Sequence, residues 1–233
     1  MRMVTSNQGG PDVTRIPLRR RAAIELGVLA GATALFLLLL PNRPLWANVG
    51  LALLALALVA LSARETRAEF WGPPTADWAW RLRRSSGLVL GLSLPVALAF
   101  GAFAAAGVQP RAAGAVLAEL FDPGLFATLA LFVPWALVQQ TLFQFYLLGR
   151  LRALLPGALP LIPVVLTGLG YGAVHLPDRE LALLTAAAGI LWSYAYQRDR
   201  VLLPLALSHA LLGTTYFAWV RGRALALSLL GAD

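Results

Sequence analysis

The sequence predicts an all-α polytopic membrane protein, a bundle of about seven transmembrane helices. Hydrophobic residues make up 59% of the 233 residues, whereas charged residues make up only 13%. Long stretches from Ala22 onward carry almost no charge. A helix that crosses a bilayer needs about 20 mostly apolar residues, and this chain supplies several such stretches.

Seven apolar segments have the required length, at roughly 22–41, 45–62, 86–108, 124–148, 158–176, 180–197 and 201–219. An eighth helix stays open, because the last apolar stretch, Ala224–Leu230, is too short to span. We expect one transmembrane domain over residues 22–221, between an N-terminal segment, 1–21, and a C-terminal tail, 222–233.

The basic residues predict the orientation. All 19 are arginine, and with a cytoplasmic N-terminus fourteen of them lie on the cytoplasmic side. Only Arg43, Arg111, Arg179, Arg221 and Arg223 then lie outside. The positive-inside rule therefore predicts an inside N-terminus and an outside C-terminus. The net charge of +8 indicates contact with anionic lipid headgroups rather than nucleic acid. Arginine without lysine indicates a GC-rich bacterial genome, and hence the inner (plasma) membrane.

The first span is expected to remain as an anchor, because its apolar run is too long for a cleaved signal peptide. Glu25 lies in its first turns, where a carboxylate that snorkels or pairs with arginine is the simplest interpretation. The segment from Ala63 to Arg84 combines tryptophan with arginine, and we expect it to lie as a connector on the cytoplasmic surface.

The fourth span carries three amides, Gln139, Gln140 and Gln144. Gln140 and Gln144 are four residues apart and would share a face of an α-helix. Amides that faced acyl chains would lack partners, so we expect all three to point into the bundle.

The fifth and seventh spans each hold one of the only two histidines in the chain. Tyr171 and His175 are one helical turn apart and are framed by glycines, which allow another helix to approach closely. His209 and Gly213 have the same spacing in the seventh span. The sequence thus predicts polar or small pairs on three helices.

Depth in the membrane tests whether these pairs meet. At the helical rise, Gln139 and Gln140 lie about 16 Å from Arg150, and His209 lies about 14 Å from Arg200. His175 lies about 22 Å from the start of its span and is several ångström too deep. Tilt, or a break at Pro156, Pro160 and Pro163, would close the gap.

The order and spacing of these residues resemble the CAAX prenyl protease and bacteriocin-processing (CPBP) family of glutamic intramembrane endopeptidases, over roughly residues 124–216. The family has a Glu-Glu-x-x-x-Arg motif, then an aromatic residue four before a histidine, then His-x-x-x-Asn. Here the corresponding positions are Gln139, Gln140, Gln144, Tyr171, His175, His209 and Gly213.

The resemblance implies that the first glutamate and the second-motif histidine activate water, while the third-motif His and Asn stabilise the oxyanion. This chain departs at those positions. Gln139 and Gln140 cannot exchange a proton, Gln144 replaces the arginine, and Gly213 lacks the asparagine donor. Two carboxylates and their cation are replaced together by neutral amides. The pattern therefore indicates a pocket that is retained but no longer carries charged side chains.

Two function classes stay open. The first is a catalytically impaired homologue that binds a membrane-associated peptide or a partner protein. The second is an active endopeptidase with a non-standard site at His175 and His209, since an imidazole can act as a base. The nearest acids, Glu119, Asp122, Asp178 and Glu180, lie at the outer ends of the predicted spans. No cofactor is expected, and two histidines with neutral amides make a poor metal site. A transporter is not favoured, because no paired broken helices are found.

Four further residues have a simple interpretation beside a functional one. Thr214 and Thr215 could replace the missing asparagine donor, but such hydroxyls usually bond back to their own helix. Trp135 and Trp192 could line a pocket for a lipidated substrate, although aromatic residues more often pack helix bundles.

Overall fold

The regular structure of the chain is helical wherever it is described. The computed structural model describes residues 18–39, 45–65, 77–106 and 123–222, and these ranges contain no β-strand. The predicted all-α class is confirmed.

Each of the seven predicted spans corresponds to one helix or one continuous helical run. The elements are α1 (Leu18–Leu39), α2 (Leu45–Glu65), α4 (Trp78–Ala106), α6 (Pro123–Gln140), the π-helix η1 (Thr141–Leu147), α7 (Leu148–Leu154), α8 (Leu161–Ala173), α9 (Arg179–Asp199), α10 (Leu203–Thr215) and the π-helix η2 (Tyr216–Val220). The tail at 223–233, with the suggested eighth helix, lies outside the described residues.

The described helices include several that are long and apolar enough to cross a membrane. Four runs meet this criterion: Leu18–Leu39, Trp78–Ala106, Pro123–Leu154 and Leu203–Val220. Large apolar side chains point outward from the bundle, as at Leu38 (78% exposed), Leu131 (77%) and Leu183 (73%). Outward leucines of this kind suit contact with acyl chains, which supports an integral membrane protein.

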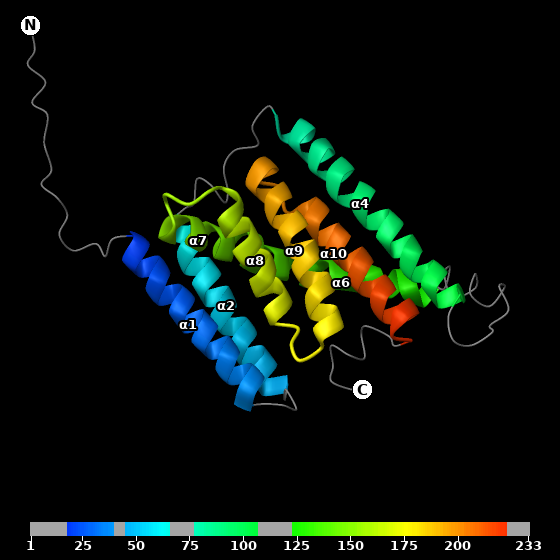
Figure 1. Ribbon diagram of the computed structural model, residues 1–233, viewed down its shortest axis with the longest axis horizontal. Coiled ribbons are helices and arrows are strands. Elements are labelled where there is room, and N and C mark those ends of the chain that lie inside the picture. Colours follow the sequence, from blue (N-terminus) through cyan, green and yellow to red (C-terminus); the bar gives the residue numbers. More distant parts are fainter. Residues whose placement is uncertain (1–17, 40–44, 66–76, 107–122, 223–233) are drawn as a thin grey trace, which may run out of the picture.

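Helices α8, α9 and α10 lie in the middle of the bundle, with α1 and α2 to one side and α4 to the other (Figure 1). Glycines bring α8 and α9 into close contact. A Cβ atom added at Gly168 would lie 2.6 Å from the backbone nitrogen of Ile190, and one at Gly172 would lie 2.5 Å from the carbonyl oxygen of Ala182. The expected close approach of a second helix to the Tyr171 region therefore takes place, and that second helix is α9.

Two ion-pair clusters join helices near the ends that the sequence places on the cytoplasmic side. Glu25 of α1 accepts a hydrogen bond from Arg150 Nε at 2.7 Å, so the expected arginine pairing of Glu25 is found. Asp199 at the end of α9 is fully buried and pairs with Arg84 and Arg198. Burial alone would raise the pKa of Asp199, but the hydrogen bonds from Arg198 and Arg84 lower it below its usual value.

A third ion-pair cluster joins ends predicted to lie on the opposite side. Arg221 Nη2 lies 2.5 Å from Asp178 Oδ2 and 3.6 Å from Glu180 Oε2. Arg221 Nε also donates to the Tyr216 hydroxyl at 2.9 Å. These contacts agree with the predicted alternation of the spans. Which side is cytoplasmic stays a prediction.

The structure corrects two of the expected boundaries. Residues 78–84, expected in a surface connector, form the first turns of α4, while 66–76 lie outside the described residues. The fifth span ends early, because α8 stops at Ala173 and His175 lies in the turn that follows.

Candidate functional site

The three amides lie where the fourth span changes its helical geometry. Helix α6 ends at Gln140, and the chain continues as the π-helix η1 before α7 begins. π-helical turns are rare and often occur at functional sites. Gln140 and Gln144 are both completely buried, whereas Gln139 is half-buried. We call Gln139, Gln140 and Gln144 the amide group.

The hydrogen bonds of the amide group are incomplete. Gln144 Oε1 accepts from the Ser193 hydroxyl of α9 at 2.8 Å. Within the described residues, Gln144 Nε2, Gln139 Oε1 and both amide atoms of Gln140 are buried without a hydrogen-bond partner. Burying each such atom without a partner costs about 1–3 kcal/mol of desolvation free energy. The amide group can therefore donate to, and accept from, a polar molecule.

The second set of candidates meets around the ring of Tyr171. The Tyr171 hydroxyl lies 2.9 Å from Nδ1 of His209, so α8 and α10 are hydrogen-bonded at this point. The Trp192 ring of α9 lies 5.1 Å from the His209 ring and 5.3 Å from the Tyr171 ring, measured between centroids. We call Tyr171, His175, Trp192 and His209 the histidine cluster.

His175 belongs to this cluster although it lies beyond the end of α8. Its ring stacks with Tyr171 at a centroid distance of 6.2 Å. The ring is half-buried, and the His175 backbone nitrogen donates to the Gly172 carbonyl in the turn. The structure thus brings both histidines to one tyrosine, which the depth comparison alone left open.

The amide group and the histidine cluster are neighbours through two elements. Phe143, next to Gln144 in η1, packs on Tyr171 with ring centroids 4.2 Å apart. Ser193, the partner of Gln144, follows Trp192 directly in α9. The two sets are therefore adjacent parts of one buried region formed by η1, α8, α9 and α10.

Gly213, Thr214 and Thr215 follow His209 in α10. A Cβ atom at Gly213 would lie 3.0 Å from the Phe132 ring of α6, so this position packs against an aromatic residue. Thr215 bonds back to the carbonyls of Leu211 and Leu212, as the simple interpretation expected. The Thr214 hydroxyl is buried and has no hydrogen-bond partner within the described residues.

Sequence reasoning missed the hydroxyls that hold the cluster in place. Trp192 Nε1 donates to Ser208 at 2.9 Å, and Ser208 lies 2.5 Å from Ser93 of α4. Trp192 is almost completely buried, whereas Trp135 is 37% exposed. Ser208 precedes His209, and Ser193 follows Gly189 by four residues, but serine alone is too common to mark a site.

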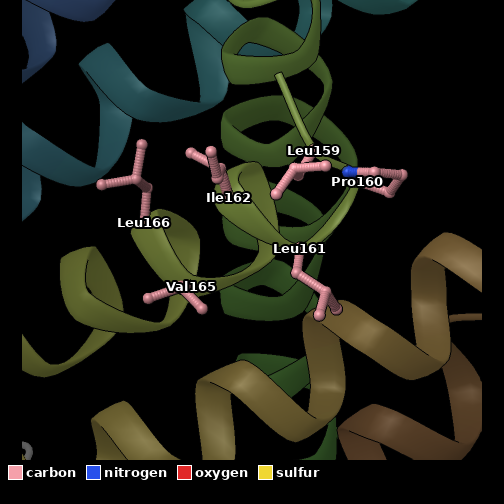
Figure 2. Close-up of a pocket in the computed structure, with 6 residues that line it drawn as sticks. All are labelled: Leu159, Pro160, Leu161, Ile162, Val165 and Leu166. Atoms are coloured by element: carbon pink, nitrogen blue, oxygen red, sulfur yellow. The ribbon is translucent and has the colours of Figure 1, made fainter.

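A separate hollow of about 380 Å³ opens near the start of α8. Figure 2 shows its lining, which consists only of apolar side chains: Leu159, Pro160, Leu161, Ile162, Val165 and Leu166. None of the six is a candidate site residue. Likewise, the described residues contain no group of three or more His, Cys, Asp or Glu that could hold a metal ion.

The comparison with protein families bears on the same region. The family model described as type II CAAX prenyl endopeptidase Rce1-like matches residues 120–215. This part of the chain is Rce1-like. The predicted resemblance to the CPBP family, placed at 124–216, is confirmed. No curated protein and no solved structure matched the chain.

The Rce1-like segment contains every candidate site residue, from Gln139 to Gly213. It also contains η1 and the two helices that meet at the glycine contact. The segment ends at Thr215, where α10 passes into η2. The departures at the glutamate, arginine and asparagine positions therefore fall inside the matched region.

Proposed function

We propose that this Rce1-like membrane protein is a catalytically impaired intramembrane peptidase homologue that binds a membrane-associated peptide or partner without cleaving it. The chain keeps both histidine positions, but amides occupy the places of the water-activating glutamates. An amide cannot take up and return a proton in the pH range of a living cell. The amides therefore remove the base that hydrolysis needs but keep groups that can bind a peptide.

The observation that carries the proposal is the unsatisfied hydrogen bonding of Gln140. Its side chain is completely buried, and neither amide atom has a partner within the described residues. A peptide group offers one N–H donor and one carbonyl acceptor, which match the acceptor and donor of a glutamine amide. A bound peptide segment would satisfy both atoms in surroundings where hydrogen bonds are strong.

The described carboxylates do not replace the missing glutamates. Asp178 is the nearest to His175 in sequence, but its Oδ1 accepts from the backbone nitrogen of Leu181 and its Oδ2 pairs with Arg221. Glu25 and Asp199 are held by arginines at helix ends. A carboxylate neutralised by an arginine is a weaker base than one isolated in an apolar cavity.

Replacement of Gln140 by leucine is expected to weaken peptide binding by about 5- to 150-fold, the equivalent of losing roughly 1–3 kcal/mol of hydrogen bonding to a buried amide. The same change is expected to raise the melting temperature of the free protein, because it removes an unsatisfied buried amide. The measurement is the fluorescence anisotropy of a labelled, prenylated CAAX peptide with the protein in lipid nanodiscs.

The matched control is Gln197→Leu, which makes the same chemical change near the end of α9. Gln197 Oε1 is also buried without a hydrogen-bond partner in the described chain, but it lies outside the amide group. We expect the peptide affinity of Gln197→Leu to stay within about twofold of the wild type. Equal peptide affinities for Gln140→Leu and the wild type would refute the proposed binding role of the amide group.

The second test concerns hydrolysis. The wild-type protein is expected to cleave a quenched fluorescent prenylated peptide no faster than His175→Ala does. The triple variant Gln139→Glu, Gln140→Glu, Gln144→Arg is expected to gain measurable cleavage, because it restores a buried carboxylate that can act as a base. Cleavage by the wild type that disappears in His175→Ala would instead establish the active endopeptidase.

A further inference from the structure

We infer that the Tyr171 hydroxyl holds His209 in the tautomer that carries its proton on Nε2. His209 then presents an N–H donor to a ligand, and Tyr171 is the residue that positions this donor. The ligand part of the inference rests on the proposed function, whereas the tautomer is a property of the free protein.

Tyr171 is locked in place on several sides. Its side chain is completely buried, and its ring packs on Phe143 at 4.2 Å and on Trp192 at 5.3 Å between centroids. A Cβ atom at Gly189 of α9 would lie 2.9 Å from the Tyr171 Cβ, so only glycine leaves room for the tyrosine there. The hydroxyl therefore reaches His209 Nδ1 from a fixed position.

The His209 ring is fixed as well. Phe132 meets its plane edge-on at 5.4 Å, and Trp192 lies against it at 5.1 Å. Trp192 is itself held by its hydrogen bond to Ser208, which is bonded to Ser93 of α4. With both rings fixed, the 2.9 Å contact between Tyr171 and His209 is a defined hydrogen bond with one shared proton.

Two arrangements of that proton are conceivable, and burial distinguishes them. If His209 Nδ1 donated, the Tyr171 O–H would need another acceptor, and Tyr171 is 0% exposed with His209 as the partner of its hydroxyl. If Tyr171 donates, the unmet donor is Nε2–H of His209, and His209 as a residue retains 7% exposure whereas Tyr171 retains none. Because an unsatisfied buried donor is costly, the proton that lacks a partner belongs on the more accessible residue.

This assignment separates the roles of the two histidines. With Nδ1 accepting from Tyr171 and Nε2 protonated, neutral His209 can donate to a carbonyl oxygen but has no free lone pair with which to accept a proton. His175 is then the histidine that can act as a base in any residual hydrolysis. A phenylalanine at position 171 would keep the packing of the ring and lose this control.

The chain is well suited to a direct test, because it contains only two histidines. Nitrogen-15 NMR of the full-length protein, labelled at histidine and placed in lipid nanodiscs near neutral pH, reports the protonation of each ring nitrogen. His175→Ala assigns the signals. We expect a pyridine-type Nδ1 and a pyrrole-type Nε2 for His209 in the wild type. A wild-type His209 protonated on Nδ1 would overturn the inference without any further variant.

Tyr171→Phe removes only the hydroxyl. We expect the ratio of the Nε2–H to the Nδ1–H tautomer of His209 to fall about fivefold, which corresponds to the loss of one hydrogen bond of typical net strength. The matched control is Tyr146→Phe, which removes another buried hydroxyl, one bonded to Glu25 at 3.0 Å. The control should leave the His209 ratio unchanged, and an unchanged ratio in Tyr171→Phe would refute the positioning role.

The outcomes for the inference and for the proposed function can be told apart. The tautomer is measured without any ligand, so it survives if peptide binding is never observed. Conversely, wild-type cleavage of the prenylated peptide would refute the impaired function and leave the tautomer assignment standing. A His209 protonated on Nδ1, together with tight peptide binding, would leave the proposed function intact and refute only the role of Tyr171.

Discussion

Glu25→Ala is expected to lower the free energy of unfolding by about 3–5 kcal/mol, the range found when one partner of a buried ion pair is removed. The Glu25 carboxylate accepts from Arg150 at 2.7 Å and from the Tyr146 hydroxyl at 3.0 Å. Arg150 is only 3% exposed, so its charge would stay buried with its main counter-ion gone. Glu25 and Ala22 are also the buried residues of α1. The Glu25–Arg150 ion pair is therefore the principal polar attachment of α1 to the Rce1-like segment.

The measurement is denaturant or thermal unfolding in detergent micelles, compared with an exposed ion pair of the same kind. Asp77 is 68% exposed at its side chain and lies 3.8 Å from Arg81, so Asp77→Ala should change stability by less than about 1 kcal/mol. The double variant Glu25→Leu, Arg150→Met should recover much of the loss, because neither charge then stays buried. Equal losses in Glu25→Ala and Asp77→Ala would contradict a buried, energetically coupled pair.

This pair illustrates what the sequence could not supply. An apolar run reveals its own length, so the seven helical runs and the all-α class could be predicted from the hydropathy of the sequence. Glu25 was expected to pair with an arginine, and Arg21 one turn earlier in α1 does so, but the second partner, Arg150, lies 125 residues away. Nothing local to either residue identifies the other, because the contact is formed only when α1 packs against α7.

The candidate site was predictable to a similar extent. Residue type and spacing selected His175, His209 and the three glutamines, since polar groups in a membrane helix need partners. The π-helix η1 was not predicted, because its residues have the same apolar character as an ordinary helix. The end of α8 before His175 was also missed, because Ala173 and Val174 are apolar and the first helix-breaking residue, Pro177, comes four residues after the helix ends.

The glycine contact between α8 and α9 supports the second prediction of large effect. Gly168→Ala and Gly172→Ala are each expected to destabilise the protein by about 1–3 kcal/mol, as overpacking does. The added Cβ atoms would lie 2.6 Å from the Ile190 nitrogen and 2.5 Å from the Ala182 oxygen. Both are backbone atoms, which cannot rotate away as a flexible side chain can. The helices would have to separate.

Two other glycines provide matched controls for the same substitution. Gly149 of α7 has nothing within 4 Å of an added Cβ, and at Gly170 of α8 the nearest atom is a Leu147 methyl at 3.3 Å. Gly149→Ala should be neutral or stabilising by up to about 1 kcal/mol, since alanine favours helix over glycine. Gly170→Ala should lie between that result and the destabilised pair. Melting temperatures that are the same for all four variants would show that α8 and α9 do not pack at this distance.

The Gly172→Ala variant also links packing to the site. Tyr171 precedes Gly172 in α8, and its hydroxyl reaches His209 of α10 across the same contact region. A hydrogen bond at 2.9 Å weakens steeply once its atoms separate by several tenths of an ångström. If α8 is pushed from α9, the His209 signals of Gly172→Ala should move toward those of Tyr171→Phe although the hydroxyl is still present. Unchanged His209 signals in a destabilised Gly172→Ala variant would mean that the Tyr171–His209 hydrogen bond persists when α8 and α9 separate. The bond would then not depend on the contact between these helices.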